Sequence, residues 1–122
     1  MGYELKLYII EPSGITGEDG IYCSVIAMVD VCKPGYDSAL YALNTKENNT
    51  KKFYFYGEDG NNPIVEDRYG DKIRFASVDD TLEAAIKDNK VDKYRRFDIL
   101  IACLKAVKNS KFGEPLVAFY GY

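Results

Sequence analysis

The fold is decided by residues 21–32, which read Ile-Tyr-Cys-Ser-Val-Ile-Ala-Met-Val-Asp-Val-Cys. This run is almost continuously apolar and rich in β-branched side chains, and it stops before Pro34-Gly35. Such a composition is typical of a strand that is covered on both faces. We therefore predict a central, fully buried β-strand over residues 21–32.

The segment before it alternates apolar and polar residues, which predicts a second strand over residues 3–10. The aliphatic side chains that share one face of this strand are Leu5, Leu7 and Ile9. The proline and glycines of the following stretch, residues 12–20, predict a loop. We therefore expect two strands joined by an irregular connection.

After the central strand, Asp37 or Ser38 is a candidate cap for a short helix. Residues 52–56 then predict an aromatic strand, in which the two phenylalanines occupy one face and Tyr54 and Tyr56 occupy the other. Apolar segments on either side of Tyr69-Gly70 predict a short hairpin or an ordered loop.

The C-terminal half carries two helical patterns. Ser77 and Asp80 resemble a capping box at the start of the first helix, and Asp92 is a candidate cap for the second. Apolar side chains recur at helical spacing over residues 97–107, the strongest amphipathic signal of the chain. Residues 116–120 predict a closing strand.

Strands and helices are mixed without a regular βαβ repeat, so we predict an α+β fold. The expected arrangement is a single domain over residues 1–122, with a mainly antiparallel sheet packed against two C-terminal amphipathic helices. No run approaches the roughly 20 apolar residues of a membrane span, and the start has no signal-peptide pattern. We therefore expect neither membrane insertion nor secretion.

The composition narrows the possible chemistry. The 122 residues include no histidine, which removes the commonest general base and metal ligand, but they include 11 tyrosines and 6 phenylalanines. The three cysteines form no Cys-x-x-Cys pair and indicate free thiols. The acidic loop after Gly57 lacks the spacing of a calcium loop. We therefore predict no catalytic residues, no metal and no cofactor.

Charge is unevenly distributed along the chain. Residues 57–83 carry eight acidic and three basic side chains, whereas residues 84–111 carry three acidic and eight basic ones. These segments either compensate each other within the fold or orient a charged partner. The formal net charge of −3 argues against direct nucleic-acid binding.

One acid, Asp30, interrupts the apolar central strand. A buried carboxylate either serves as a general acid or base, or forms a structural pair with a lysine or arginine. An enzyme built on Asp30 or on a lone cysteine is therefore one hypothesis, and a structural ion pair is the other.

Three motifs of the C-terminal half resemble small, uncharacterised proteins of tailed bacteriophages. They are Pro-Ile-Val-Glu-Asp-Arg-Tyr-Gly-Asp at 63–71, Tyr-Arg-Arg-Phe at 94–97 and Val-Ala-Phe-Tyr-Gly-Tyr at 117–122. The resemblance implies a location in the cytoplasm of a host bacterium. It also implies a role in host takeover or counter-defence.

The leading hypothesis is a phage-encoded, non-enzymatic protein that blocks a host defence protein by direct contact, as an anti-CRISPR-like or other anti-defence inhibitor. Aromatic anchors and acidic side chains suit a basic partner surface. The predicted contact residues are Tyr54, Tyr56, Glu58, Asp59, Glu66, Asp67 and Tyr69.

Two alternatives stay open. Basic residues interleaved with an aromatic one at the start of the last helix predict a site for a small ligand or nucleotide, in a sponge-like protein. Its residues are Tyr94, Arg95 and Arg96. Separately, exposed edge strands at the sheet margin predict a possible homodimer.

Overall fold

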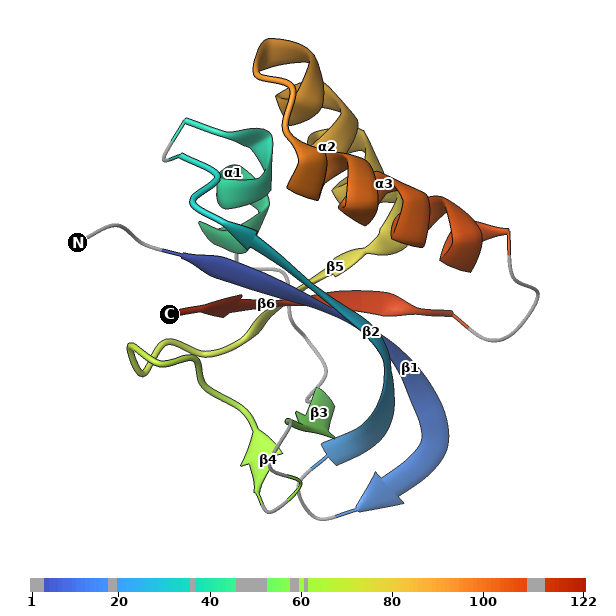
Figure 1. Ribbon diagram of the computed structural model, residues 1–122. Helices are drawn as coiled ribbons and strands as arrows, with labels where there is room; N and C mark the ends of the chain where they lie inside the picture. Colours follow the sequence, from blue (N-terminus) through green and yellow to red (C-terminus); the bar gives the residue numbers. More distant parts are fainter. Residues whose placement is uncertain are drawn as a thin grey trace.

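Two strands of 13 residues each form the centre of the fold, β1 (Leu5–Gly17) and β2 (Gly20–Cys32). They pair antiparallel from Leu5↔Cys32 to Gly17↔Gly20, with three shifts of register along the way. The computed structural model describes residues 4–17, 20–35, 37–45, 53–57, 60, 62–109 and 114–122, and Figure 1 shows its elements.

Four shorter strands of the described segments extend the hairpin into one six-stranded sheet. They are β3 (Phe53–Tyr56), β4 (Pro63–Ile64), β5 (Arg74–Ser77) and β6 (Leu116–Gly121). The strand order is β4-β3-β2-β1-β6-β5. Every neighbouring pair is antiparallel except β2 and β3. The predicted α+β fold with a mainly antiparallel sheet is therefore confirmed.

The three helices of the described residues lie on one side of the sheet (Figure 1): α1 (Ala39–Thr45), α2 (Val78–Val91) and α3 (Arg95–Lys108). The core beneath them contains Leu5, Leu7 and Ile9, the three side chains that the alternation assigned to one face of the first strand. α3 contributes buried side chains to the same core, as its apolar periodicity predicted. Within the described ranges, every helix is too short or too polar to span a bilayer.

A second core lies on the opposite side of β1. It contains Tyr8 and Ile10 from β1, Phe55 from β3 and Phe75 from β5. The segments next to the two outer strands also pair, because the Ile73 amide donates to the Val65 carbonyl at 3.2 Å and Glu66 bridges Lys72. The sheet therefore curls around this core. The short hairpin or ordered loop predicted around Tyr69-Gly70 is a turn, closed by an isolated β-bridge between Glu66 and Lys72.

The helix starts follow the predicted caps in two cases out of three. The Asp80 amide donates to the Ser77 hydroxyl at 3.0 Å, and the Tyr41 amide donates to the Ser38 hydroxyl at 3.0 Å. The assignment of Asp92 is wrong, because it ends α2 instead of beginning α3.

The Asn89 side chain serves the start of α3 instead. Its amide nitrogen donates to Asp98 at 2.9 Å, and its oxygen accepts from the Tyr94 amide at 2.9 Å.

The predicted loop over residues 12–20 is also wrong, because β1 continues through Pro12 to Gly17. Proline lacks an amide donor and fits only a strand whose second edge is unpaired. That condition holds here, since the pairing of β1 with β6 ends at Ile10↔Leu116, whereas Pro12 is in register with Cys23 of β2 alone.

The prediction that the central strand is buried along its whole length is wrong. Val25, Ile26 and Met28 are 40%, 47% and 39% exposed, respectively. The reason is that β3 pairs only with Ile21 and Tyr22, so nothing in the described sheet covers the outer edge of β2 beyond Tyr22.

Candidate functional site

Three tyrosines gather on the outer face of the sheet where β2 and β3 meet. Tyr22 lies with its ring centroid 5.7 Å from that of Tyr54 and 5.9 Å from that of Tyr56. Tyr54 and Tyr56 are 6.1 Å apart with perpendicular rings. We refer to Tyr22, Tyr54 and Tyr56 as the tyrosine cluster.

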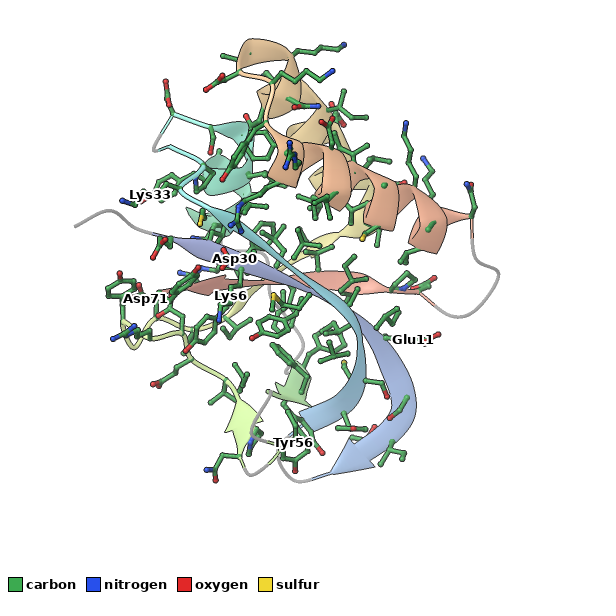
Figure 2. All side chains as sticks on the ribbon, in the orientation of Figure 1. Lys6, Glu11, Asp30, Lys33, Tyr56 and Asp71 are labelled. Atoms are coloured by element: carbon green, nitrogen blue, oxygen red, sulfur yellow. The ribbon has the colours of Figure 1, made fainter. Side chains whose placement is uncertain are left out.

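The cluster faces outward because the phenylalanines between its members face inward. Phe53 packs against Phe75 at 5.4 Å, and Phe55 packs against Tyr8 at 5.0 Å between ring centroids. The alternation predicted from residues 52–56 therefore holds. Tyr56 remains 39% exposed and lies at the end of the molecule away from the helices (Figure 2).

Tyr22 was not among the predicted contact residues. It is in register with Tyr54 across the parallel pair β2–β3. Parallel strands that are distant in sequence leave no local signal of their pairing. Only alternation around Cys23, which is buried in the second core, could have placed Tyr22 on the opposite face.

The predicted acidic residues lie in different surroundings. Glu58 and Asp59 lie outside the described residues. Glu66 is exposed. Asp67 organises its own turn, since its Oδ1 accepts from the amides of Tyr69 at 2.9 Å and Asp71 at 3.0 Å. The carboxylate of Asp67 is therefore already used within the chain.

Tyr69 lies in this turn and is exposed. The Arg68 amide donates to the Gly121 carbonyl at 3.1 Å, which fixes the turn against the end of β6. Figure 2 shows Asp71, in the same turn, at a different corner of the molecule from Tyr56. The structure therefore places Tyr69 and the tyrosine cluster on separate parts of the surface.

An open cleft of about 580 Å³ lies between these two regions. Lys6 and Tyr8 of β1 line it together with Tyr120 of β6, and Glu66 and Asp67 line it from the other side. These side chains come from elements far apart in sequence. A cleft with one ammonium group, two carboxylates and two aromatic rings offers recognition of a polar surface or ligand.

Asp30, the acidic residue within the apolar central strand, forms hydrogen bonds to other parts of the same chain. Asp30 is in register with Lys6, and its carboxylate accepts from the Cys32 amide at 2.8 Å and from the Tyr122 hydroxyl. Its carbonyl accepts from Arg96 at 2.7 Å. Cys32 has a φ of 57°, a left-handed conformation that the Asp30 carboxylate stabilises by holding its amide.

This environment changes the acidity of two neighbours. Burial, and then the hydrogen bond to Asp30, raises the pKa of the Tyr122 hydroxyl. Burial and the nearby Asp30 charge raise the pKa of the Cys32 thiol. Both groups are therefore held in their protonated, neutral forms at neutral pH, in which Tyr122 acts as a hydrogen-bond donor.

The alternative ligand residues at the start of α3 have different contacts. Tyr94 precedes the helix and packs edge-on against Phe97 at 5.2 Å. Arg96 donates to the Asp30 carbonyl, and Arg95 is exposed. The basic segment meets the acidic one at Lys108 and Asp79, where nitrogen and oxygen are 3.0 Å apart on an exposed surface. An exposed pair of this kind contributes little stability.

The three cysteines are free thiols, and no group of three or more acidic or thiol side chains in the described segments is arranged to hold a metal ion. Cys23 is buried in the second core, and this burial raises the pKa of its thiol from 9.0 to about 11. At pH 8, this higher pKa makes the thiolate fraction of Cys23 about 100-fold lower than that of an unperturbed cysteine.

We therefore expect slow labelling of Cys23. A variant with Cys32→Ser and Cys103→Ser should react with a thiol reagent at pH 8 about 100-fold more slowly when folded than when unfolded in guanidinium. The folded rate should keep rising above pH 9. Equal rates in the two states would contradict the burial of this thiol.

Comparison with protein-family models, with curated proteins and with solved structures finds no match for this chain.

Proposed function

We propose that this protein acts by binding another protein, with the tyrosine cluster as the anchor of the contact. The observation that carries the proposal is the gathering of three tyrosine rings, mutually within 6.1 Å, on an outer face of the sheet. A tyrosine buries a large, rigid ring while its hydroxyl still forms hydrogen bonds, so tyrosines are enriched in protein interfaces.

The charge of the chain segment that follows Tyr56 supports a basic partner. Two of its acids, Glu66 and Asp67, line the cleft, whereas Asp79, Asp80 and Glu83 lie on α2. The segment over residues 57–83, which begins directly after Tyr56, carries eight acidic and three basic side chains. Complementary charge speeds association and rejects partners of the wrong sign. The same negative charge disfavours nucleic acid as the direct ligand.

The contacts of the ionisable side chains favour a non-enzymatic role. The sequence contains no histidine, and Asp30 is held by the Tyr122 hydroxyl and the Cys32 amide. A general acid or base needs a carboxylate that can reach a substrate. The carboxylate of Asp30 serves the fold instead.

The proposed partner is a defence protein of a host bacterium, and the proposed location is the host cytoplasm. The support is the resemblance of the motifs at 63–71, 94–97 and 117–122 to small phage proteins. Defence proteins that handle nucleic acid present basic channels, and an acidic, aromatic surface is complementary to such a channel. Blocking the channel would stop the defence without any chemical reaction.

The test is capture of a partner from bacterial lysate by the wild type and by the double variant Tyr54→Ala, Tyr56→Ala. Anchor residues of an interface cost 2 kcal/mol or more when truncated, so we expect at least about a 30-fold loss of affinity. The exposed, unrelated Val91→Ala variant should bind like the wild type. Tyr54→Phe, Tyr56→Phe should retain most of the affinity, because the rings remain.

Two outcomes would count against the proposal. One is that the wild type retains no bacterial protein. The other is that the double alanine variant retains its partner as well as the wild type, although both are equally folded by circular dichroism.

A small-ligand binder is the second candidate function, and the cleft beside Lys6 is the observation that favours it. A ligand at 100 times its dissociation constant adds about 2.7 kcal/mol to stability. Thermal-shift measurements with a panel of nucleotides test this candidate. If a nucleotide raises the melting temperature, loss of this shift in Lys6→Met would place the ligand in the cleft, and its loss in Arg95→Met would place the ligand at the start of α3.

A further inference from the structure

The cleft beside Lys6 has walls of opposite charge. Lys6 and Tyr8 alternate with Leu5 and Leu7 along β1, so their side chains lie on the face of the sheet away from the helices (Figure 2). Tyr120 of β6 is in register with Lys6 and continues this wall. The segment after β4 forms the other wall and carries two carboxylates, but no basic side chain of this segment lines the cleft.

The Lys6 ammonium lacks a counterion within the described part of the chain. It lies 4.8 Å from the centroid of the Tyr122 ring, in a cation–π contact, and forms no ion pair there. Asp30, its neighbour across the strand pair, holds the Tyr122 hydroxyl and the Cys32 amide instead. An ammonium group that is half-buried without a counterion gains from an anionic group of a ligand.

The acidic wall is fixed by its own turn. Asp67 accepts the amides of Tyr69 and Asp71 with one carboxylate oxygen, Oδ1, and the turn is bonded to the end of β6. Its second oxygen accepts no hydrogen bond from the described residues, and the neighbouring Glu66 is exposed. Two carboxylates on a rigid wall favour a cationic group without the cost of ordering a loop.

We infer that the cleft binds a small zwitterion of dipeptide size, with its carboxylate at Lys6 and its ammonium group at Glu66 and Asp67. A purely anionic ligand would meet two carboxylates, and a purely cationic one would meet the Lys6 ammonium. A molecule with both charges complements both walls. Tyr8 and Tyr120, with ring centroids 6.3 Å apart, supply the apolar contact between them.

The size of the cleft agrees with such a ligand, because about 580 Å³ lies within the range of small-molecule sites. This inference rests on the second candidate function and names the ligand class for it. It does not depend on the tyrosine cluster, whose members are absent from the lining of the cleft.

NMR titration with glycylphenylalanine tests the inference. A ligand of this size binds with a dissociation constant of about 1 mM, so the titration extends to about 10 mM. The amide resonances of Lys6, Glu66 and Tyr120 should shift, and those of α2 should not. Two derivatives serve as matched ligands: the N-acetyl form lacks the ammonium group, and the C-terminal amide lacks the carboxylate. Each should bind at least about 10-fold more weakly, because it loses one hydrogen bond between charged groups.

Two variants assign the charges to their walls. Lys6→Met should weaken binding of the dipeptide about 10-fold but should not weaken binding of its amide, which has no carboxylate for Lys6 to hold. Glu66→Gln should weaken binding of the dipeptide but not of its N-acetyl form. Lys87→Met removes an exposed lysine of α2 outside the cleft and should bind all three ligands like the wild type.

Three results would overturn the inference: no amide shifts at the highest dipeptide concentration, equal affinities for the three ligands, or an equal loss for the dipeptide and its amide in Lys6→Met. If a nucleotide binds through Lys6 and the dipeptide does not, the zwitterion is wrong and the small-ligand candidate stands. The double variant Tyr54→Ala, Tyr56→Ala should bind the dipeptide like the wild type. Failure of partner capture is therefore distinct from failure of this inference.

Discussion

Replacing Phe55 by alanine is expected to lower the free energy of unfolding by about 3–5 kcal/mol, the range for a buried phenylalanine. Phe55 is fully buried in the second core, where its ring packs against Tyr8. β3 has only two register pairs with β2 and two with β4, so backbone pairing alone holds it weakly. Its position depends on this ring.

Urea denaturation measures the effect. The matched control is Tyr56→Ala, one residue further along the same strand, which removes a partly exposed ring and should cost far less. A loss below 1 kcal/mol for Phe55→Ala would mean that the second core does not anchor β3. A small effect of Tyr56→Ala also allows its effect on binding to be attributed to lost contact.

Asp88→Ala is expected to lower the free energy of unfolding by about 3 kcal/mol. Asp88 is a buried residue of α2, and its two carboxylate oxygens accept from the amides of Ala39 at 2.7 Å and Leu40 at 3.0 Å. Hydrogen bonds to a charged group contribute about 1.5–3 kcal/mol each, and alanine would leave both donors unpaired. The negative charge also stabilises the N-terminus of α1.

Urea denaturation and amide hydrogen exchange test this prediction together. Leu40 should lose its protection in Asp88→Ala, whereas Asp92→Ala, an exposed position at the end of α2, should change neither quantity appreciably. If Asp88→Ala leaves exchange in α1 unchanged, the carboxylate is not what holds the start of this helix.

Two predictions for the β1–β2 hairpin were wrong, the full burial of residues 21–32 and the loop over residues 12–20, and both errors have one physical cause. The apolar run at 21–32 correctly predicted a strand, but composition records the preference for burial and not the identity of the covering strand. β3 diverges after Tyr22, and this long-range event leaves Val25, Ile26 and Met28 exposed. The loop predicted at Pro12 was wrong for the same reason. A proline fits into β1 at this position only because the pairing of β1 with β6 ends before it, at Ile10.

Local patterns were more informative where the relevant contacts are local. Ser77 caps α2 through an amide three residues away, and the alternation over residues 53–56 separates buried rings from outward ones. The cleft could not be predicted, because Lys6, Tyr120 and Glu66 come from three distant parts of the sequence. The same holds for Asp30, whose carboxylate binds Tyr122 across the sheet instead of a lysine or arginine.

Hydrogen exchange of the protein alone and with its captured partner tests the central claim most directly. If the tyrosine cluster is the contact surface, amides of Phe53–Tyr56 and of the facing residues 20–22 gain protection when the partner binds, and those of α2 do not. Protection that spares these two strands and appears only around the start of α3 or along the cleft would contradict the account.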